Sequence, residues 1–99
     1  MRNLEVKIRP LAEIDIEEIW HSIALYNIIA AENFSDKLKQ KIQLLCAFPE
    51  HGPLRPDIFP NARISIEGQY LIIYRFEKDV VEVIRVVHGA RDLNELDIF

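Results

Sequence analysis

The sequence is poor in the residues from which metal and phosphate sites are built. It contains one cysteine, Cys46, three glycines that are never clustered, and three histidines that lie far apart. A single cysteine cannot form an internal disulfide, which fits a reducing compartment, and it is too few for a zinc site. A phosphate-binding motif would need a glycine-rich loop, which this chain lacks. We therefore expect neither a bound metal nor a cofactor.

Long apolar runs and an excess of positive charge are also missing. The apolar runs are too short to span a bilayer, and the first residues lack the apolar segment of a signal peptide. The net charge of −4 argues against general nucleic-acid binding, because proteins that track phosphates usually carry excess lysine and arginine. These absences predict a cytoplasmic protein that binds no membrane and makes no direct sequence-specific contact with nucleic acid.

What the chain does contain is enough apolar sequence for one folded domain. Its 99 residues are 49% hydrophobic, which argues against disorder and suffices for a modest core. No repeat or low-complexity tract interrupts the chain, so we expect a single domain over residues 1–99.

The first half of the chain predicts a strand and two helices. Apolar and charged residues alternate over 4–9, which is typical of a strand with one buried face. Pro10 ends this strand and can begin a helix, which helical spacing extends over about 11–26. A second apolar stripe at helical spacing runs over 31–46. Because the joint at 26–28 is short, the two helices should form an antiparallel hairpin.

The second half predicts a loop followed by strands. Residues 49–61 contain four prolines and a glycine, which is typical of a loop. A short strand over 63–66 precedes two β-branched runs, 70–76 and 80–87, which a three-residue turn joins into a hairpin. The predicted order is βααβββ. This is an α+β fold with an N-terminal strand, an antiparallel two-helix hairpin and then a three-stranded antiparallel sheet.

Alternation along the β-hairpin assigns its side chains to two faces. The bulkier face should lie under the helices, and the face with two arginines should stay accessible. The first face carries Tyr70, Ile72, Tyr74, Phe76, Val80, Ile84 and Val86. The second carries Leu71, Ile73, Arg75, Val81, Val83, Arg85 and Val87. A one-residue slip in the turn would exchange these sets relative to each other.

Cations near the end of the last strand are the best candidates for function. Arg75, Arg85, His88 and Arg91 could form a binding or catalytic face. The alternative is structural: His88 ends a strand, Asp92 caps the following turn, and Arg91 pairs with an acid.

For two residues outside this group, Arg55 and Cys46, a functional role must also be weighed against a structural one. In Pro49-x-x-Gly52-x-x-Arg55 the arginine could contact a ligand, although anchoring the loop by hydrogen bonds to carbonyls is favoured. Cys46 lies on the apolar stripe of the second helix, so we expect a buried core thiol and not a nucleophile.

The order and spacing of these segments resemble the toxins of the RelE/ParE superfamily over nearly the whole chain. The parts that match are the N-terminal strand, an acidic helix with Asp-Ile-Glu-Glu-Ile-Trp at 15–20, Ala31-x-x-Phe34, Pro49-x-x-Gly52-x-x-Arg55, Gly68-x-Tyr70-x-x-x-Tyr74 and Val86-Val-His88-Gly-Ala-Arg91-Asp92. A valine-rich last strand that ends in His-Gly-x-Arg-Asp is most similar to the ParE branch. The resemblance implies a toxin of a bacterial type II toxin–antitoxin system, silenced by a small ParD-like antitoxin.

The two branches of this superfamily differ in target. RelE-like members are mRNA endonucleases that act on the ribosome, whereas ParE-like members are described as inhibitors of DNA gyrase. Three groups that RelE-like chains carry are absent. Leu71 stands where they have an arginine, only Arg63 stands where they have lysines, and no tyrosine follows Tyr74. Nuclease chemistry needs such cations and an acid–base pair.

The resemblance therefore favours a ParE-type toxin that binds DNA gyrase and is not an enzyme. The residues that would contact gyrase or the antitoxin are Arg55, Arg63, Arg75, Arg85, His88 and Arg91. The alternative is a RelE-like ribosome-dependent mRNA endoribonuclease in which His88 acts as the base. A third reading is a decayed toxin that is kept only as an antitoxin partner.

Overall fold

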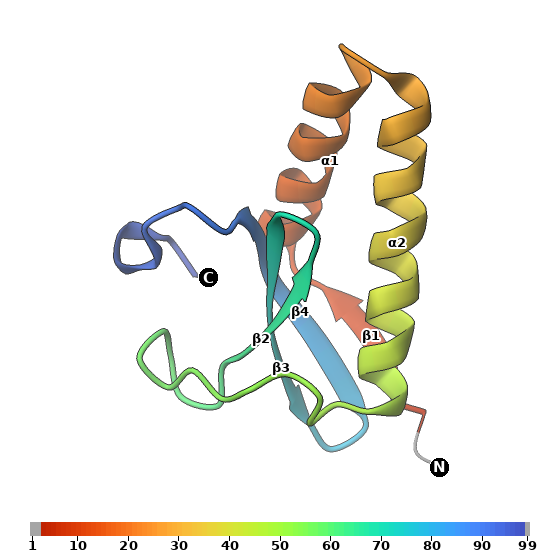
Figure 1. Ribbon diagram of the computed structural model, residues 1–99. Coiled ribbons are helices and arrows are strands. Elements are labelled where there is room, and N and C mark those ends of the chain that lie inside the picture. Colours follow the sequence, from red (N-terminus) through yellow and green to blue (C-terminus); the bar gives the residue numbers. More distant parts are fainter. Residues whose placement is uncertain (1–2, 99) are drawn as a thin grey trace.

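The computed structural model describes residues 3–98 and places two helices against one face of a four-stranded sheet (Figure 1). The strands are β1 (Glu5–Ile8), β2 (Arg63–Glu67), β3 (Tyr70–Glu77) and β4 (Val80–His88). The helices are α1 (Pro10–Ala24) and α2 (Ile28–Ala47), and a short 3-10 helix, η1 (Leu93–Glu95), follows β4. The predicted α+β fold with the order βααβββ is confirmed.

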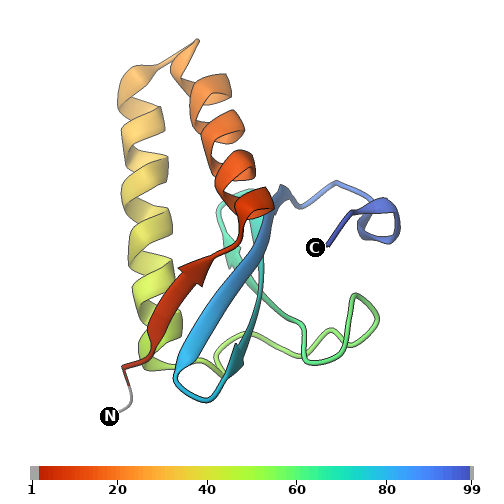
Figure 2. The ribbon, with the colours of Figure 1, turned by 180° about the vertical axis from the view of Figure 1, so that it is seen from behind.

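The strands are arranged in the order β1-β4-β3-β2, so β1 and β2 lie at the two edges of the sheet. β2, β3 and β4 pair antiparallel, as the sequence predicted. β1 pairs with β4 in parallel and extends the sheet to four strands (Figure 2). Parallel pairing needs a long crossover between the strands, and the chain that leads from β1 to β4 includes both helices.

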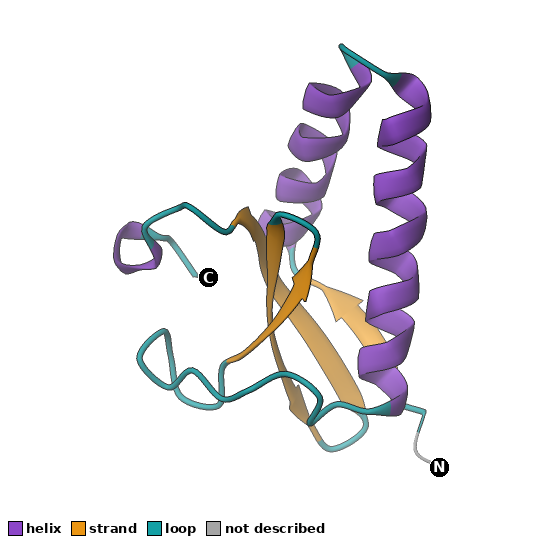
Figure 3. Cartoon of the chain, viewed as in Figure 1, coloured by secondary structure: helices purple, strands orange, loops and turns teal. Residues whose placement is uncertain are grey.

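α1 and α2 form the predicted antiparallel hairpin (Figure 3). Pro10 stands in the first turn of α1, where its missing N–H would have had no helical partner. Asn27 caps α2, because its Oδ1 accepts a hydrogen bond from the amide of Ala30 at 3.1 Å. Within residues 3–98, neither helix has the length and apolar character that crossing a membrane requires.

The larger core cluster lies between α2 and the sheet. From α2 it takes the predicted stripe of Phe34, Leu38, Ile42, Leu45 and Cys46, and from the sheet it takes Ile72, Tyr74, Val81, Val83 and Val86. Cys46 is buried as expected, and burial raises the pKa of its thiol. The thiolate is therefore disfavoured, which suits a core residue and not a nucleophile.

The turn between β3 and β4 is one residue shorter than predicted. Glu77 pairs directly with Val80, and Lys78 in the turn adopts a φ of 52°. The resulting slip turns Val81 and Val83 toward the helices, so their predicted place on the accessible face is wrong.

A β-bulge then reverses this slip, so that the side chains of Val86 and Val87 lie on the faces of the sheet that were predicted for them. The register against β3 shifts so that Ile84 is the extra residue, and it lies on the face opposite the helices, against prediction. Val86 lies under the helices and Val87 lies opposite, as predicted.

The outer face of the sheet, which is turned away from the helices, is covered by other parts of the chain. The prediction that this face is accessible is therefore wrong. The second core cluster, on the outer face, consists of Ile64, Ile73, Ile84, Val87 and Leu96. Residues 49–62, called the outer loop below, and the C-terminal segment 89–98 both lie on this side (Figure 1). The outer loop adds Ile58 and Phe59 to the cluster, and the C-terminal segment adds Leu93 and Ile98.

Candidate functional site

His88 ends β4 with both ring nitrogens in contact with neutral groups. Its Nδ1 accepts a hydrogen bond from the amide of Ala90 at 3.1 Å, and its Nε2 lies 3.2 Å from Oε1 of Gln69. Because Nδ1 is an acceptor, the neutral ring carries its proton on Nε2 and donates it to Gln69. The rings of Tyr70 and His88 also pack in a T-shaped arrangement. These contacts fix the tautomer and pair His88 with no acid.

Arg85 is buried against α1, and its predicted place on an accessible face is wrong. Its guanidinium donates two hydrogen bonds to the carboxylate of Asp15, at 2.7 and 2.8 Å, and a third to the carbonyl of Asp97. Asp15 also accepts a hydrogen bond from the amide of Val86 at 3.0 Å. The hydrogen bonds to Asp15 raise the pKa of Arg85, which therefore stays charged. This arginine joins α1, β4 and the C-terminal segment.

Arg75 is also bound inside the molecule. Its Nε donates to Glu82 at 2.8 Å, and Arg9 contacts the other oxygen of that carboxylate at 3.3 Å. Burial raises the pKa of Glu82, but the hydrogen bonds and charges of the two arginines outweigh it, so the pKa is lowered. Because Glu82 is shared between two arginines, its single negative charge offsets only part of the charge that Arg75 was expected to offer a target.

Arg63, and not Arg55, anchors the outer loop by binding carbonyls. Its Nη1 donates to the carbonyl of Gly52 at 2.8 Å and to that of Glu50 at 3.3 Å. Arg55 instead forms a two-point ion pair with Asp57 at the surface. The carbonyl-binding role expected for Arg55 therefore belongs to an arginine on β2.

Tyr74 holds the start of the same loop, which sequence reasoning missed. Its hydroxyl donates to the carbonyl of Pro49 at 2.9 Å, and burial raises its pKa, so the proton is retained. Tyr74 belongs to one of the motifs that resemble the toxin superfamily, and Gly52 belongs to another. Their presence in these motifs was the only feature of the sequence that pointed to a contact between strand and loop. The alternation of side chains along the strand predicted that the ring of Tyr74 is in the core, but it did not predict the hydrogen bonds of its hydroxyl.

Arg91 is the cation of the predicted set that remains available to a partner. It is exposed, and its guanidinium has no hydrogen-bond or ion-pair partner among residues 3–98. Asp92 caps η1 by accepting a hydrogen bond from the amide of Asn94 at 2.9 Å, so the structural reading of that residue is confirmed. The predicted cations therefore do not gather into one face.

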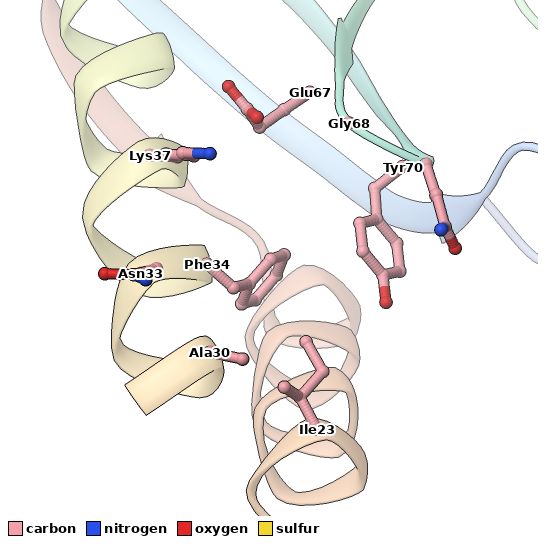
Figure 4. A pocket seen from close by; sticks show the side chains of 9 residues that line it. Ile23, Ala30, Asn33, Phe34, Lys37, Glu67, Gly68 and Tyr70 are labelled. Atoms are coloured by element: carbon pink, nitrogen blue, oxygen red, sulfur yellow. The ribbon is translucent and has the colours of Figure 1, made fainter. Parts of the chain in front are cut away.

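A groove lies between the helical hairpin and the turn that joins β2 to β3 (Figure 4). It has a volume of about 470 Å³ and an apolar floor of Ile23, Ala30, Phe34 and Tyr70. Lys37 and Glu67 also line it. This hollow suits an apolar side chain of a partner better than a small charged substrate. Residues 3–98 contain no cluster of three His, Cys, Asp or Glu side chains that could hold a metal.

The edge of β2 is covered over only part of its length. The amide of Ile64 donates to the carbonyl of Pro53 at 3.2 Å, so the backbone groups of Ile64 point away from β3. In an extended strand the groups of Ile66 point the same way. The side chain of Ile66 is 63% exposed. This end of the edge therefore presents an amide and a carbonyl to an incoming strand.

A second, smaller hollow lies beside this edge. Its volume is about 250 Å³, and its lining includes His51, Ser65 and Ile66. The hydroxyl of Ser65 is buried and has no hydrogen-bond partner within residues 3–98. Buried polar groups are normally paired, so this hydroxyl is an exception within the fold.

Comparison with known proteins gives matches to one toxin superfamily. The family described as the ParE toxin of the type II toxin–antitoxin system parDE matches residues 6–93. The chain is similar to a structure of the chromosomal ParDE toxin–antitoxin system of P. aeruginosa, with 18% identity and a TM-score of 0.71, over 87% of this chain and 96% of that one.

A second solved structure shares the fold. It is the RelBE2 toxin–antitoxin complex of Mycobacterium tuberculosis, with 21% identity and a TM-score of 0.59, over 87% of this chain and 98% of that one. None of the curated proteins matches the sequence. The family match spans most of the chain and agrees with the fold of both structures, so the chain belongs to the ParE toxin family of type II toxin–antitoxin systems.

Proposed function

We propose that this toxin acts by binding DNA gyrase and blocking supercoiling, and that it does not cut mRNA. The observation that best supports the proposal is that both ring nitrogens of His88 are already hydrogen-bonded. A general base needs a free nitrogen within reach of the proton that it removes. Here Nδ1 is occupied by the amide of Ala90, and Nε2 is the protonated nitrogen and faces Gln69. His88 would have to break one of these contacts before it could act as a base.

The surroundings of β3 also favour a toxin that is not a nuclease. Leu71 stands where RelE-like chains carry an arginine, and it packs at the margin of the outer cluster. A cleavage site would need cations there to stabilise the phosphate in the transition state. Arg85, the arginine of β4, is buried against Asp15. The outer face therefore offers apolar side chains where nuclease chemistry would need charge.

The test compares the two activities on the same preparation. Purified toxin should inhibit supercoiling by gyrase in a dose-dependent way and should leave ribosome-bound mRNA intact. Cleavage of mRNA without inhibition of gyrase would overturn the proposal and favour the nuclease alternative. We place this encounter in the bacterial cytoplasm, where gyrase works on DNA.

We further propose that a ParD-like antitoxin silences the toxin by lying in the groove and adding a strand to β2. The two solved structures compared above come from toxin–antitoxin systems. The apolar floor of the groove suits side chains of an antitoxin helix, and the open edge at Ile66 suits its extended segment.

Replacing Ile66 by proline tests this arrangement. The amide of Ile66 points outward, so its loss spares the pairing with β3 but blocks strand addition. Antitoxin binding measured by co-purification should weaken strongly, while the circular dichroism spectrum stays unchanged. Undiminished binding by a folded Ile66→Pro variant would exclude the β2 edge as the antitoxin site.

A further inference from the structure

The tip of the helical hairpin carries apolar side chains that the fold does not use. This tip patch consists of Leu25, Tyr26, Ile28 and Ile29, which are 83%, 92%, 51% and 67% exposed. The tip projects beyond the sheet (Figure 1). Single exposed apolar residues are ordinary, but contiguous ones on a soluble domain mark interaction sites.

The charges around the tip patch restrict its partner. No aspartate, glutamate, lysine or arginine occurs from Ile19 to Ala31. The charges that flank this stretch are acidic: Glu17 and Glu18 precede it, and Glu32 follows it, all exposed. An apolar surface with an acidic rim is repelled by DNA, RNA and anionic membranes. It complements a protein groove that is apolar inside and basic at its rim.

Of the five arginines that were expected to bind a target, only Arg91 has a guanidinium with no hydrogen-bond or ion-pair partner among residues 3–98. Arg63, Arg75 and Arg85 are bound to groups of the same molecule. Arg55 is paired with Asp57. We therefore expect a target to be held largely by contacts other than ion pairs with these paired arginines. The tip patch can supply such contacts, because it offers several large apolar side chains within five consecutive residues.

We propose that the tip patch is the surface by which the toxin grips its target, and that the target supplies an apolar groove with a basic rim. This inference rests on the proposed function, because gyrase is the target that is tested. A second copy of the chain fits less well. Two tips in contact would both carry acidic neighbours, Glu17, Glu18 and Glu32, and neither would supply a basic rim.

The experiment uses the double variant Tyr26→Ser, Ile29→Ser, with Ile14→Ser as the matched control. Ile14 is an exposed isoleucine of α1, 49% exposed, that lies outside the tip patch. The double variant should bind gyrase at least about tenfold more weakly than the parent, as loss of anchor side chains does in other interfaces. The control should bind like the parent. Antitoxin affinity and the circular dichroism spectrum should not change.

Four other results would each overturn the inference. They are unchanged gyrase binding by the double variant, an equal loss in the control, a loss confined to antitoxin binding, and a dimer of the parent that the double variant dissociates. If the parent does not bind gyrase, the proposed function fails separately. A growth-arrest assay then tests the tip patch, because growth arrest reports the loss of any target. If the folded double variant no longer arrests growth, the role of the tip patch is supported. If it still arrests growth, that role is overturned.

Discussion

The amide of Gly52 donates a hydrogen bond to the hydroxyl of Tyr74 at 2.9 Å, between the outer loop and β3. The approach is so close that a Cβ on Gly52 would lie 2.8 Å from that hydroxyl and 2.3 Å from the carbonyl oxygen of Ile64. Only glycine lets the loop backbone reach the ring. One buried side chain of the sheet thereby fixes the loop that covers the outer face.

Replacing Tyr74 by phenylalanine should destabilise the protein by about 1–3 kcal/mol. The ring still fills its site, but the amide of Gly52 and the carbonyl of Pro49 lose a buried partner. Urea unfolding followed by circular dichroism measures the change. Tyr26→Phe is the control, because that hydroxyl is exposed and should contribute nothing. Equal stability of Tyr74→Phe and the parent would mean that water replaces these bonds.

Replacing Asp15 by alanine should cost about 3–5 kcal/mol, because it leaves the charge of Arg85 buried without a counter-charge. The measurement is the free energy of unfolding in urea. The double variant Asp15→Leu, Arg85→Met removes both charges and should recover much of the loss. A loss in the double variant as large as that in Asp15→Ala would show that the hydrogen bonds, and not the unpaired charge, set the cost.

Glu82 should make stability depend on acid pH. Its pKa is lowered in the folded state by Arg75 and Arg9, so the unfolded chain binds the proton more readily. Its stabilising contribution is therefore complete above the ordinary glutamate pKa of about 4.3 and disappears as the pH falls through the lower folded value. Thermal midpoints of the parent and Glu82→Gln should differ at neutral pH and converge in that acid range. A constant difference down to low pH would assign the effect to packing.

His88→Ala should still arrest growth when its expression matches that of the parent. The gyrase proposal needs no proton transfer from this ring, and its contacts to Ala90 and Gln69 lie at the surface. The readout is colony formation after induction, with folding checked by circular dichroism. Complete loss of toxicity in a folded variant, together with mRNA cleavage by the parent, would establish the nuclease alternative.

The sequence by itself determined the elements and their order, because their signals are local. Pro10 marks the start of a helix, the apolar stripe of α2 has helical spacing, and two β-branched runs make a hairpin. The motifs at 49–55 and 86–92 lie in order along the same elements, so the family resemblance was also visible in the sequence.

Only the tertiary structure decided which cations are free and which face of the sheet is covered. Arg85 and Asp15 are 70 residues apart in sequence, so no local pattern pairs them. A turn one residue short reverses the facing of Val81 and Val83, because side chains on a strand alternate. Which arginine binds the outer loop depends on how the loop crosses β2. Long-range contacts settle these points, because each depends on where two distant segments meet.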